Sequence, residues 1–438
     1  MAGMSRLMGS GKQDPSDLNV DRISCLPWDV LDNIFGRLTI VDAVRTSVLA
    51  KDWRYKWLSH TEFFLNSVEV AFILNREDLR WDVVASVINR YLLHHTSAIR
   101  SFSLIASCDE HHPDVYQWIQ YLSKQDVETL LFQETGSSYY RFKMPSHLFS
   151  FEKLKSLSLT TCALRIPPTF ERFKWLYHIF FRDVSICDAD LSRLILSCPL
   201  LKYLTLLHIS GLKHLRIHAP KLSWLLIDTV YEDIVIEAAP ILSTVRIAPS
   251  FRRPGAEPIL KLLSVIHCLS AIGSLNSLAL SGEFIKLLIA DFGLKKIPLR
   301  NDAVTNLDLH SLRFENIDVF GVCLSLLRSC RNTKCFCFYI ETAKNATKLI
   351  RKFFKKNYGQ FSFPELEKVT VICDSNAGLG SAANLIEFII CHSPKLRFLT
   401  IYKEGMNNRQ ITNMFSRFRM NCPHARFRLT VSGRHQTS

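Results

Sequence analysis

Most of the chain after residue 95 repeats one hydrophobic pattern, in which three apolar positions are separated first by two positions and then by one. Five successive copies lie 28, 27, 22 and 25 residues apart, with starts at Ile99, Val127, Leu154, Leu176 and Leu201. A period of roughly 20 to 29 residues with this spacing is typical of units that carry one strand and one helix or turn. The pattern predicts a solenoid with a parallel sheet, in which neighbouring units protect each other's edges.

The interval between copies is shorter in the middle of the chain, where starts fall at Leu201, Leu212, Leu222, Tyr231 and Leu242. About ten residues per copy leave no room for a helix between strands. We therefore expect a strand on both faces of the solenoid in this region, with the copies at Leu212 and Tyr231 forming the outer strands. Elsewhere helical or turn segments such as residues 190–198 separate the copies. The repeats have the spacing of leucine-rich repeats.

The period is interrupted between Pro249 and Gly273, where residues 259–269 have the character of a helix. Copies follow this interruption at Leu275, Val304, Phe336, Leu366 and Leu396, of which the one at Phe336 is weaker. We expect the parallel sheet to continue through all of them.

The beginning of the chain has a helical pattern instead. Apolar residues recur every four positions, with two more beside them, at Leu26, Val30, Ile34, Leu38, Leu31 and Phe35. This spacing predicts a helix with one apolar stripe. A second stripe and a pair of tryptophans follow, at Val41, Val44, Val48, Leu49, Trp53 and Trp57, with Asp42 placed to cap the second helix. Three short helices in about forty residues cannot bury so many large groups among themselves, so some should face a partner.

Residues 21–60 resemble the F-box, the helical module that binds the Skp adaptor of cullin-RING ubiquitin ligases. The matching features occur in order without a gap: Leu26-Pro27, the Val-Leu-Ile-Leu spacing, Arg45-Thr46-Ser47-Val48-Leu49 and Trp53-Arg54-Tyr55-Lys56-Trp57. Thr39 and Ala50 depart from the usual proline and serine, and neither removes an apolar anchor. The resemblance implies contacts with the adaptor, and through it a cullin, by Leu26, Pro27, Val30, Leu31, Ile34, Leu38, Val48, Leu49 and Trp53. The alternative is that these residues only begin the domain core.

The end of the chain, over residues 363–396 and 418–426, resembles the FBD region of plant F-box/FBD/LRR-repeat proteins. The order of F-box, leucine-rich repeats and FBD-like end covers nearly the whole chain, and implies an α/β fold with a three-helix F-box before a curved parallel sheet. The expected divisions are a disordered tail (1–20), the F-box (21–60), a linker or helical cap (61–95), the repeats (96–362), the FBD-like repeats (363–430) and a second tail (431–438). The strand pattern runs through the FBD boundary, so we expect no structural break there.

Residues between the apolar positions of each repeat strand should line the concave face of the solenoid. Aromatic and arginine side chains are enriched at binding hot spots. The candidates for contact with a target protein are therefore His178, Arg182, Tyr203, Trp224 and Arg246. The alternative for each position is an ordinary exposed strand residue.

Charge is unevenly distributed along the 438 residues, of which 48% are hydrophobic, enough for a large folded body. The formal net charge is +14, and residues 395–438 hold nine Lys or Arg and one acid. This basic end could hold an acidic or phosphorylated target or RNA, or simply be a solvated cap. The sequence does not favour nucleic acid, because it carries no aromatic RNA motif and no zinc-finger spacing.

Each sequence motif that would indicate catalysis, a phosphate-binding loop or a metal site is incomplete. Asp291-Phe292-Gly293 lacks the other kinase motifs, residues 9–13 lack the full phosphate-loop pattern, and Cys335 and Cys337 lack a zinc partner pair, so core packing is favoured for them. No apolar run reaches a membrane-spanning length and the start is polar, so we expect a nuclear or cytoplasmic protein without cofactor. The F-box resemblance implies a non-enzymatic substrate receptor of a Skp-cullin-F-box ubiquitin ligase. The alternative is a repeat-scaffold or nucleic-acid-binding protein with no ligase role.

Overall fold

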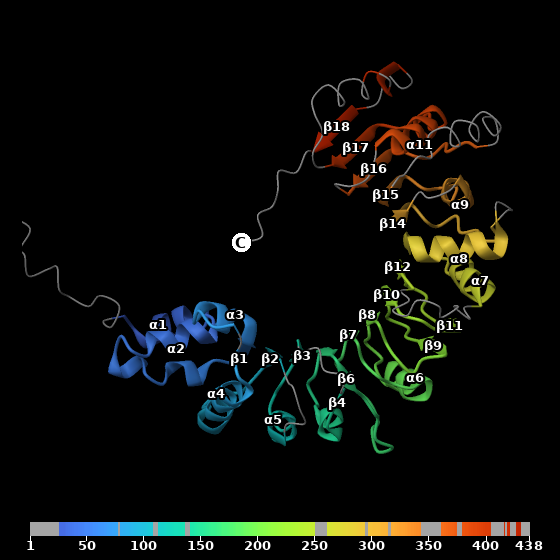
Figure 1. Cartoon of the computed structure of the whole chain (residues 1–438). Coiled ribbons are helices and arrows are strands. Elements are labelled where there is room, and N and C mark those ends of the chain that lie inside the picture. Colours follow the sequence, from blue (N-terminus) through green and yellow to red (C-terminus); the bar gives the residue numbers. More distant parts are fainter. Residues whose placement is uncertain are drawn as a thin grey trace, which may run out of the picture.

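The chain forms an open arc with strands along its inner side and helices along its outer side (Figure 1). The computed structural model describes residues 26–77, 79–107, 113–135, 141–249, 261–293, 297–313, 317–342, 361–374, 379–403, 416, 418–420 and 426–430. The tails predicted at 1–20 and 431–438 lie outside the described residues. The arc confirms the predicted α/β class and the curved parallel sheet.

One parallel sheet runs the length of the arc, and its strands follow one another in chain order apart from those on the outer face. In the described residues it has 14 strands: β1 (Glu62–Asn66), β2 (Ser101–Ala106), β3 (Thr129–Glu134), β5 (Ser156–Thr160), β7 (His178–Arg182), β8 (Tyr203–Leu207), β10 (Trp224–Asp228), β12 (Thr244–Ile247), β13 (Ser277–Ser281), β14 (Asn306–Arg313), β15 (Cys335–Thr342), β16 (Lys368–Cys373), β17 (Phe398–Lys403) and β18 (Arg426–Thr430).

Two helices precede the sheet, a third follows its first strand, and the others cover its convex side. Those at the beginning of the chain are α1 (Trp28–Phe35), α2 (Ile40–Thr46) and α3 (Ser67–Ile73). The helices on the outer side of the arc are α4 (Trp81–His94), α5 (Pro113–Leu122), α6 (Asp188–Leu196), α7 (Leu262–Ala271), α8 (Gly282–Phe292), α9 (Ile317–Ser329) and α11 (Leu379–Cys391) (Figure 1). A short 3-10 turn, η4 (Ser146–Ser150), takes the place of a helix in one repeat.

Outer strands occur where the repeat interval shortens. Strands β9 (His214–His218) and β11 (Asp233–Ala238) pair in parallel and form a small sheet of their own. Both fall on the copies predicted to be outer strands, which confirms that prediction. A second outer pair, β4 (Phe142–Lys143) and β6 (Cys162–Ala163), was not predicted, because two-residue strands leave no periodic signal.

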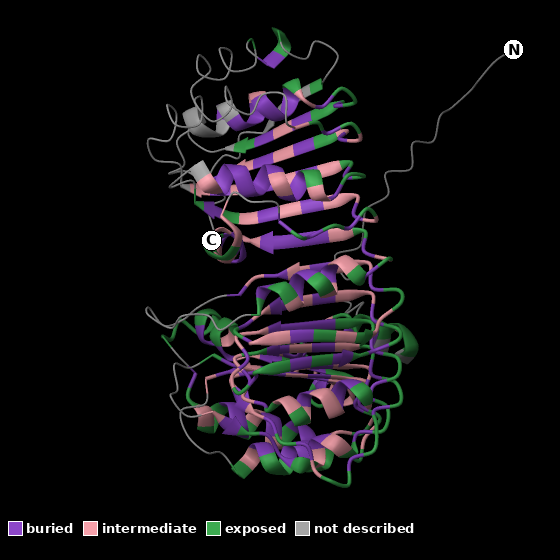
Figure 2. Cartoon of the chain, turned by 90° about the vertical axis from the view of Figure 1, so that its right-hand side faces the viewer, coloured by how far each residue is buried: buried purple, intermediate pink, exposed green. Residues whose placement is uncertain are grey.

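The apolar repeat positions form the core between the sheet and its outer layer. Leu157, Ile179, Leu204 and Leu225 lie opposite one another on adjacent strands and are fully buried. Each such side chain contributes about 1.5 to 3 kcal/mol relative to exposure. Figure 2 shows the resulting alternation, with buried positions along the strands interrupted by half-buried and exposed ones.

The sheet begins before the repeats were expected to. Strand β1 lies in the segment predicted as a linker or helical cap, and pairs with β2 from Glu62 to Asn66. Its run Phe63-Phe64-Leu65 does not alternate between apolar and polar residues, so its strand character was hidden. At the other end, β16, β17 and β18 extend the same sheet without a break, as predicted for the FBD-like region.

Candidate partner-binding surfaces

Helix α1 separates its apolar residues into two stripes with different roles. Leu31 and Phe35 are turned into the core, with exposed fractions of 3% and 4%. Val30 and Ile34 remain exposed at 38% and 42%. Both pairs are four residues apart, so each forms its own row along the helix. The row of Val30 and Ile34 is the one available to a partner.

Two large and exposed apolar side chains follow helix α2. Ile40 and Ala43 bury the inner side of the helix, while Val48 and Leu49, which follow it, are 84% and 70% exposed. Large apolar groups at such exposure are characteristic of interaction sites when they cluster. Val44, at 39% exposure on α2, extends the same apolar character, and the sequence did not mark it as a contact.

Thr39 caps the amino end of α2. Its hydroxyl oxygen accepts a hydrogen bond from the backbone amide of Asp42 at 3.1 Å, and its hydroxyl donates to the Asp42 carboxylate at 2.8 Å. The capping residue is therefore Thr39. The sequence had assigned this role to Asp42. A threonine at this position supplies a side-chain acceptor for an unpaired amide of the first turn, which proline cannot do.

The third helix expected at Trp53 and Trp57 is replaced in the structure by two 3-10 turns, η2 (Lys51–Trp53) and η3 (Lys56–Ser59). Both tryptophans are buried. The rings of Trp53 and Phe35 meet edge to face with centroids 5.3 Å apart. Trp53 therefore fixes α1 to the turns that follow.

Aromatic side chains continue this core into the first repeat. The Tyr91 ring of α4 packs against Trp57 at 6.2 Å and against Phe63 of β1 at 4.5 Å, and Phe63 stacks on Phe102 of β2 at 5.1 Å. The Tyr91 hydroxyl also donates a hydrogen bond to the carbonyl oxygen of His60 at 2.5 Å. The initial helices thus share one hydrophobic core with the repeats, which couples the orientation of the two parts.

On the concave face, strand register brings three of the predicted target-binding residues into one row. His178, Tyr203 and Trp224 lie opposite one another on β7, β8 and β10. The rings of His178 and Tyr203 have centroids 6.2 Å apart, and Nδ1 of His178 is 2.9 Å from the Ser156 hydroxyl oxygen. Burial lowers the pKa of His178, so its ring is neutral at physiological pH.

The two predicted arginines lie at separate places on this face. Arg182, at the end of β7, is exposed and its guanidinium lies 5.5 Å from the centre of the Phe180 ring, a favourable cation-π distance. Arg246 is half-buried on β12, beyond β8 and β10. The structure therefore groups His178, Tyr203 and Trp224, and gives Arg246 a different set of neighbours.

Comparison with known families identifies both parts of the chain. The F-box domain model matches residues 23–65, the segment that holds α1, α2 and the two tryptophan turns. A model described as the LRR repeats of FBD-associated F-box protein At5g56370 matches residues 115–279. The chain therefore carries an F-box domain followed by leucine-rich repeats of the kind found in FBD-associated F-box proteins. The exposed apolar residues of α1 and α2 are therefore the outer surface of an F-box.

Curated relatives of this chain are also named as F-box proteins. The chain is 28% identical to the F-box/FBD/LRR-repeat protein At1g13570 of Arabidopsis thaliana over 391 residues, which is 87% of this chain and 91% of the relative. It is also 28% identical to F-box protein At5g03100 and to FBD-associated F-box protein At4g10400 of the same plant, covering 43% and 51% of this chain and 56% and 55% of theirs. The first of these relatives confirms the predicted resemblance from F-box to FBD-like end.

The F-box surface differs from the predicted set of adaptor contacts in two places. Leu31 and Trp53, which were also predicted to contact the adaptor, pack into the chain's own core and are only 3% and 7% exposed in the free chain. Leu26 and Leu38 are half-buried against the core. The predicted residues that remain well exposed are Pro27, Val30, Ile34, Val48 and Leu49.

Two histidines lie where the F-box joins the first repeat. His60 is buried, and His95 packs its ring against Tyr91 with centroids 4.7 Å apart. Burial lowers the pKa of both imidazoles, although Glu62 opposes the effect at His60 and the mutual repulsion of the two rings adds to it at His95. Both rings are therefore held neutral in the folded chain.

We expect acid to destabilise this junction. Between the ordinary histidine pKa of 6.5 and the lowered folded values, the unfolded chain binds more protons, so the free energy of unfolding falls as pH falls. Thermal unfolding from pH 7.5 down to pH 5 should show a declining melting temperature, and replacing both His60 and His95 with asparagine should flatten the decline. An unchanged pH dependence in the double variant would contradict this assignment.

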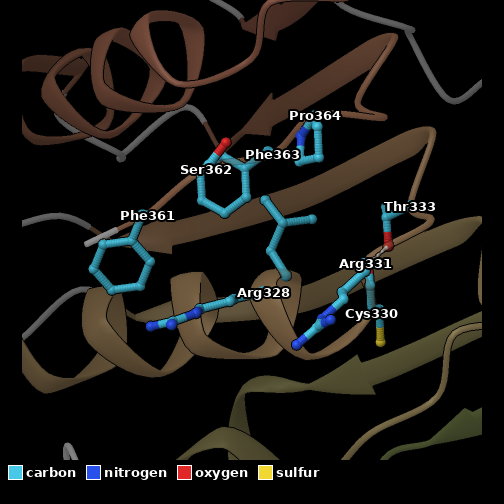
Figure 3. Close-up of a pocket in the computed structure, with 9 residues that line it drawn as sticks. Arg328, Cys330, Arg331, Thr333, Phe361, Ser362, Phe363 and Pro364 are labelled. Carbon is cyan, nitrogen blue, oxygen red and sulfur yellow. Dashed lines mark hydrogen bonds between the residues drawn. The ribbon is translucent and has the colours of Figure 1, made fainter. Parts of the chain in front are cut away.

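A cavity of about 320 Å³ lies away from both surfaces, between the end of α9 and the segment before β16 (Figure 3). Its lining includes Arg328, Arg331, Phe361 and Phe363. Residues 343–360, which precede Phe361 in the sequence, are outside the described part of the chain. In that described part no cluster of His, Cys, Asp or Glu could hold a metal ion, and no helix is long and apolar enough to cross a membrane.

Proposed function

We propose that this F-box protein is the substrate-recognition subunit of a Skp-cullin-F-box ubiquitin ligase. The observation that carries the proposal is the exposure of Val48 and Leu49 within the segment that matches the F-box model. A water-exposed pair of large aliphatic groups is unfavourable for an isolated chain, and burying both in an interface contributes about 3 kcal/mol or more. The Skp-family adaptor is the partner proposed for this surface.

The division of the molecule supports a role in delivery and not in catalysis. The F-box lies at one end of the arc and the concave face stretches away from it (Figure 1). Because the aromatic core from Trp57 to Phe102 joins the two parts, a target on the concave face is held in a defined position relative to the adaptor. The chain then promotes ubiquitin transfer by raising the local concentration of target lysines near a loaded enzyme of the complex.

The proposal extends to the other members of the assembly. A cullin is reached through the adaptor, the target is a protein held on the concave face, and the complex works in the nucleus, the cytoplasm or both. No cofactor is required in this scheme, because the chain supplies binding surfaces only.

Reconstitution tests the proposal directly. The full chain is co-expressed with a Skp adaptor, a cullin and its RING partner, purified through a tag on the chain, and incubated with ubiquitin, activating enzyme and conjugating enzyme. We expect the adaptor and cullin to co-purify, and ubiquitin to be attached to the bound proteins only when the chain is present. Absence of adaptor in the purified material would refute the ligase role and leave a repeat scaffold.

A further inference from the structure

Apolar side chains gather on the concave face around Thr205. The concave positions of β7, β8 and β10, which alternate with the buried ones, are in register in three rows. Thr205 lies at the centre of this block and is only 4% exposed. The apolar residues around it, of which Tyr203 is exposed and the others are half-buried, are Phe180, Tyr203, Leu207, Trp224 and Leu226. They form an apolar surface on the inner side of the arc (Figure 1).

Strand β5, which lies next to this block, carries only small side chains at the same positions. They are Ser156, Ser158 and Thr160. Ser158 is in register with Leu131 of β3 on one side and with Phe180 of β7 on the other. All three are half-buried, so the two large neighbours do not close over Ser158 as the neighbours of Thr205 do. A side chain from a partner can therefore reach Ser158 between two apolar groups.

Charged side chains are sparse on this face. At the concave positions of the described strands β2 to β12 they are Arg182, Asp228 and Arg246. Arg182 and Asp228 have opposite charge and lie in the last row, on either side of Leu207. Arg246 lies on β12, outside the block. His178 adds no charge, because burial lowers its pKa. The charges within the block therefore sum to zero.

Other charges that adjoin the block lie at the edges of the sheet. Just before strands β2 to β12 the charged residues are Arg100, Glu128, Lys155 and Lys202, of which Lys155 and Glu128 pair at 2.8 Å. Asp183 follows β7 at the opposite edge. The row that contains His178 is uncharged from Ser101 on β2 to Cys335 on β15. The middle of the face thus differs from the chain as a whole, whose net charge is +14.

This distribution of charge and the extent of the surface define the class of occupant. A nucleic acid requires several cations along its phosphates, which two arginines on β7 and β12 do not supply. A highly charged peptide would lose hydration against the apolar rows. The apolar positions run from Leu131 on β3 to Leu226 on β10 across five strands, about 19 Å at 4.8 Å per strand. About six residues of an extended protein segment cover that length.

We propose that the concave surface over β3 to β10 binds an uncharged apolar segment of a protein, with one large side chain on Ser158 between Leu131 and Phe180 and others on Tyr203 and Trp224. Aromatic side chains of this kind dominate the energy of many interfaces. The role of this surface as the place where a ligase target is held rests on the proposed function. The binding itself does not, because β1 and β2 separate the surface from the F-box (Figure 1).

Selection from a phage-displayed library of short random peptides tests the surface without knowledge of the target. The full chain is compared with Ser158→Phe, which fills the position between Leu131 and Phe180. The control is Ser277→Phe, the same change at a half-buried concave serine whose neighbours in register are Thr244 and Asn306. Circular dichroism and thermal unfolding establish that each variant is folded. We expect the wild type and Ser277→Phe to enrich uncharged peptides rich in Leu, Met, Phe and Trp, and Ser158→Phe to lose that enrichment.

Affinities of one selected peptide then identify the contacts. Tyr203→Ser removes an exposed ring and should weaken binding about tenfold or more, the loss expected of an aromatic hot spot, and Ser158→Phe should weaken it at least as much. Arg182→Gln and an increase in salt from 50 to 500 mM should change the affinity less than about twofold, because no ion pair is formed. Enrichment of charged peptides, enrichment of none, strong salt dependence, or equal binding by Ser158→Phe or Tyr203→Ser would overturn the proposal.

Two further results separate this surface from the alternatives. If oligouridylate binds, loses binding in Ser158→Phe, and no apolar peptide is enriched, the surface belongs to nucleic acid and the proposal fails. Adaptor co-purification is measured on the same variants and should be unchanged in Ser158→Phe. Apolar peptides that bind a chain without adaptor binding would leave this surface intact while refuting the ligase role, and the reverse outcome would refute this surface alone.

Discussion

Replacing both Val48 and Leu49 with aspartate is expected to abolish co-purification of the Skp adaptor while the repeats remain folded. Both side chains are mainly exposed in the free chain, at 84% and 70%, so the substitution costs little folding energy. In a complex the two carboxylates would be buried without partners. Loss of a hot spot of at least 2 kcal/mol corresponds to about 30-fold weaker binding, and two such sites exceed the range of a co-purification assay.

A leucine of similar exposure outside the F-box provides the control. Leu93, in the last turn of α4, is 79% exposed, so Leu93→Asp introduces a charge with the same small effect on folding. We expect this variant to bind the adaptor as the wild type does. Equal recovery of adaptor by the wild type and by the Val48→Asp, Leu49→Asp double variant would show that this apolar pair is not the docking surface.

Leu31→Asp is expected to unfold the F-box and not merely to weaken binding. Leu31 is buried on the inner row of α1, so the change removes an apolar side chain, which costs about 2 to 5 kcal/mol when a leucine is truncated in a core. It also places a carboxyl group in an apolar site at a further cost of several kcal/mol. This sum is comparable to the whole stability of a typical domain, about 5 to 15 kcal/mol. Limited proteolysis should cleave the variant within the F-box.

Val30→Asp is the matched control, because it lies next to Leu31 on the same helix but on the exposed row. It should resist proteolysis like the wild type and still lose affinity for the adaptor. If Leu31→Asp kept the protease resistance and the melting temperature of the wild type, the division of α1 into an inner and an outer row would be wrong. The pair therefore separates a structural effect from loss of a contact.

The sequence was most informative where one period dominates. Strand positions such as Leu204 and Leu225 were predicted and are buried, because three apolar groups per unit can be covered only by stacking units in register. The shortened interval at Leu212 and Tyr231 likewise predicted the outer strands β9 and β11. These features follow from spacing alone and need no knowledge of distant contacts.

Which side of a helix is buried was harder to predict where two neighbouring rows of the helix are both apolar. The spacing marks Val30, Leu31, Ile34 and Phe35 alike, and only packing against Trp53 and the first repeat determines which row is buried. Spacing also did not show which face of strand β15 carries Cys335 and Cys337, for which core packing was favoured. That prediction was wrong: both are half-buried on the concave side of β15, in register with Asn306 and Asp308.

Strand β13 shows what the spacing does not reveal, because the side chains at its concave positions are all small: Ser277, Ala279 and Ser281. Small residues carry no signal in a search for aromatic and charged contacts, although they determine which longer groups stand next to each other across the sheet. Arg246 was predicted as a concave residue, whereas its proximity to Asp308 and His310 depends on the register of three strands separated by about 60 residues of sequence.

Hydrogen exchange of the full chain with and without the Skp adaptor tests the central claim most directly. Backbone amides in residues 30–38 and 44–49 should become protected when the adaptor is added, because Val30, Ile34, Val48 and Leu49 are the proposed contacts, while the concave strands β7 to β14 should exchange as before. Unchanged exchange in the F-box, or protection confined to the repeats, would contradict the account of one end that joins the ligase and one face that holds its target.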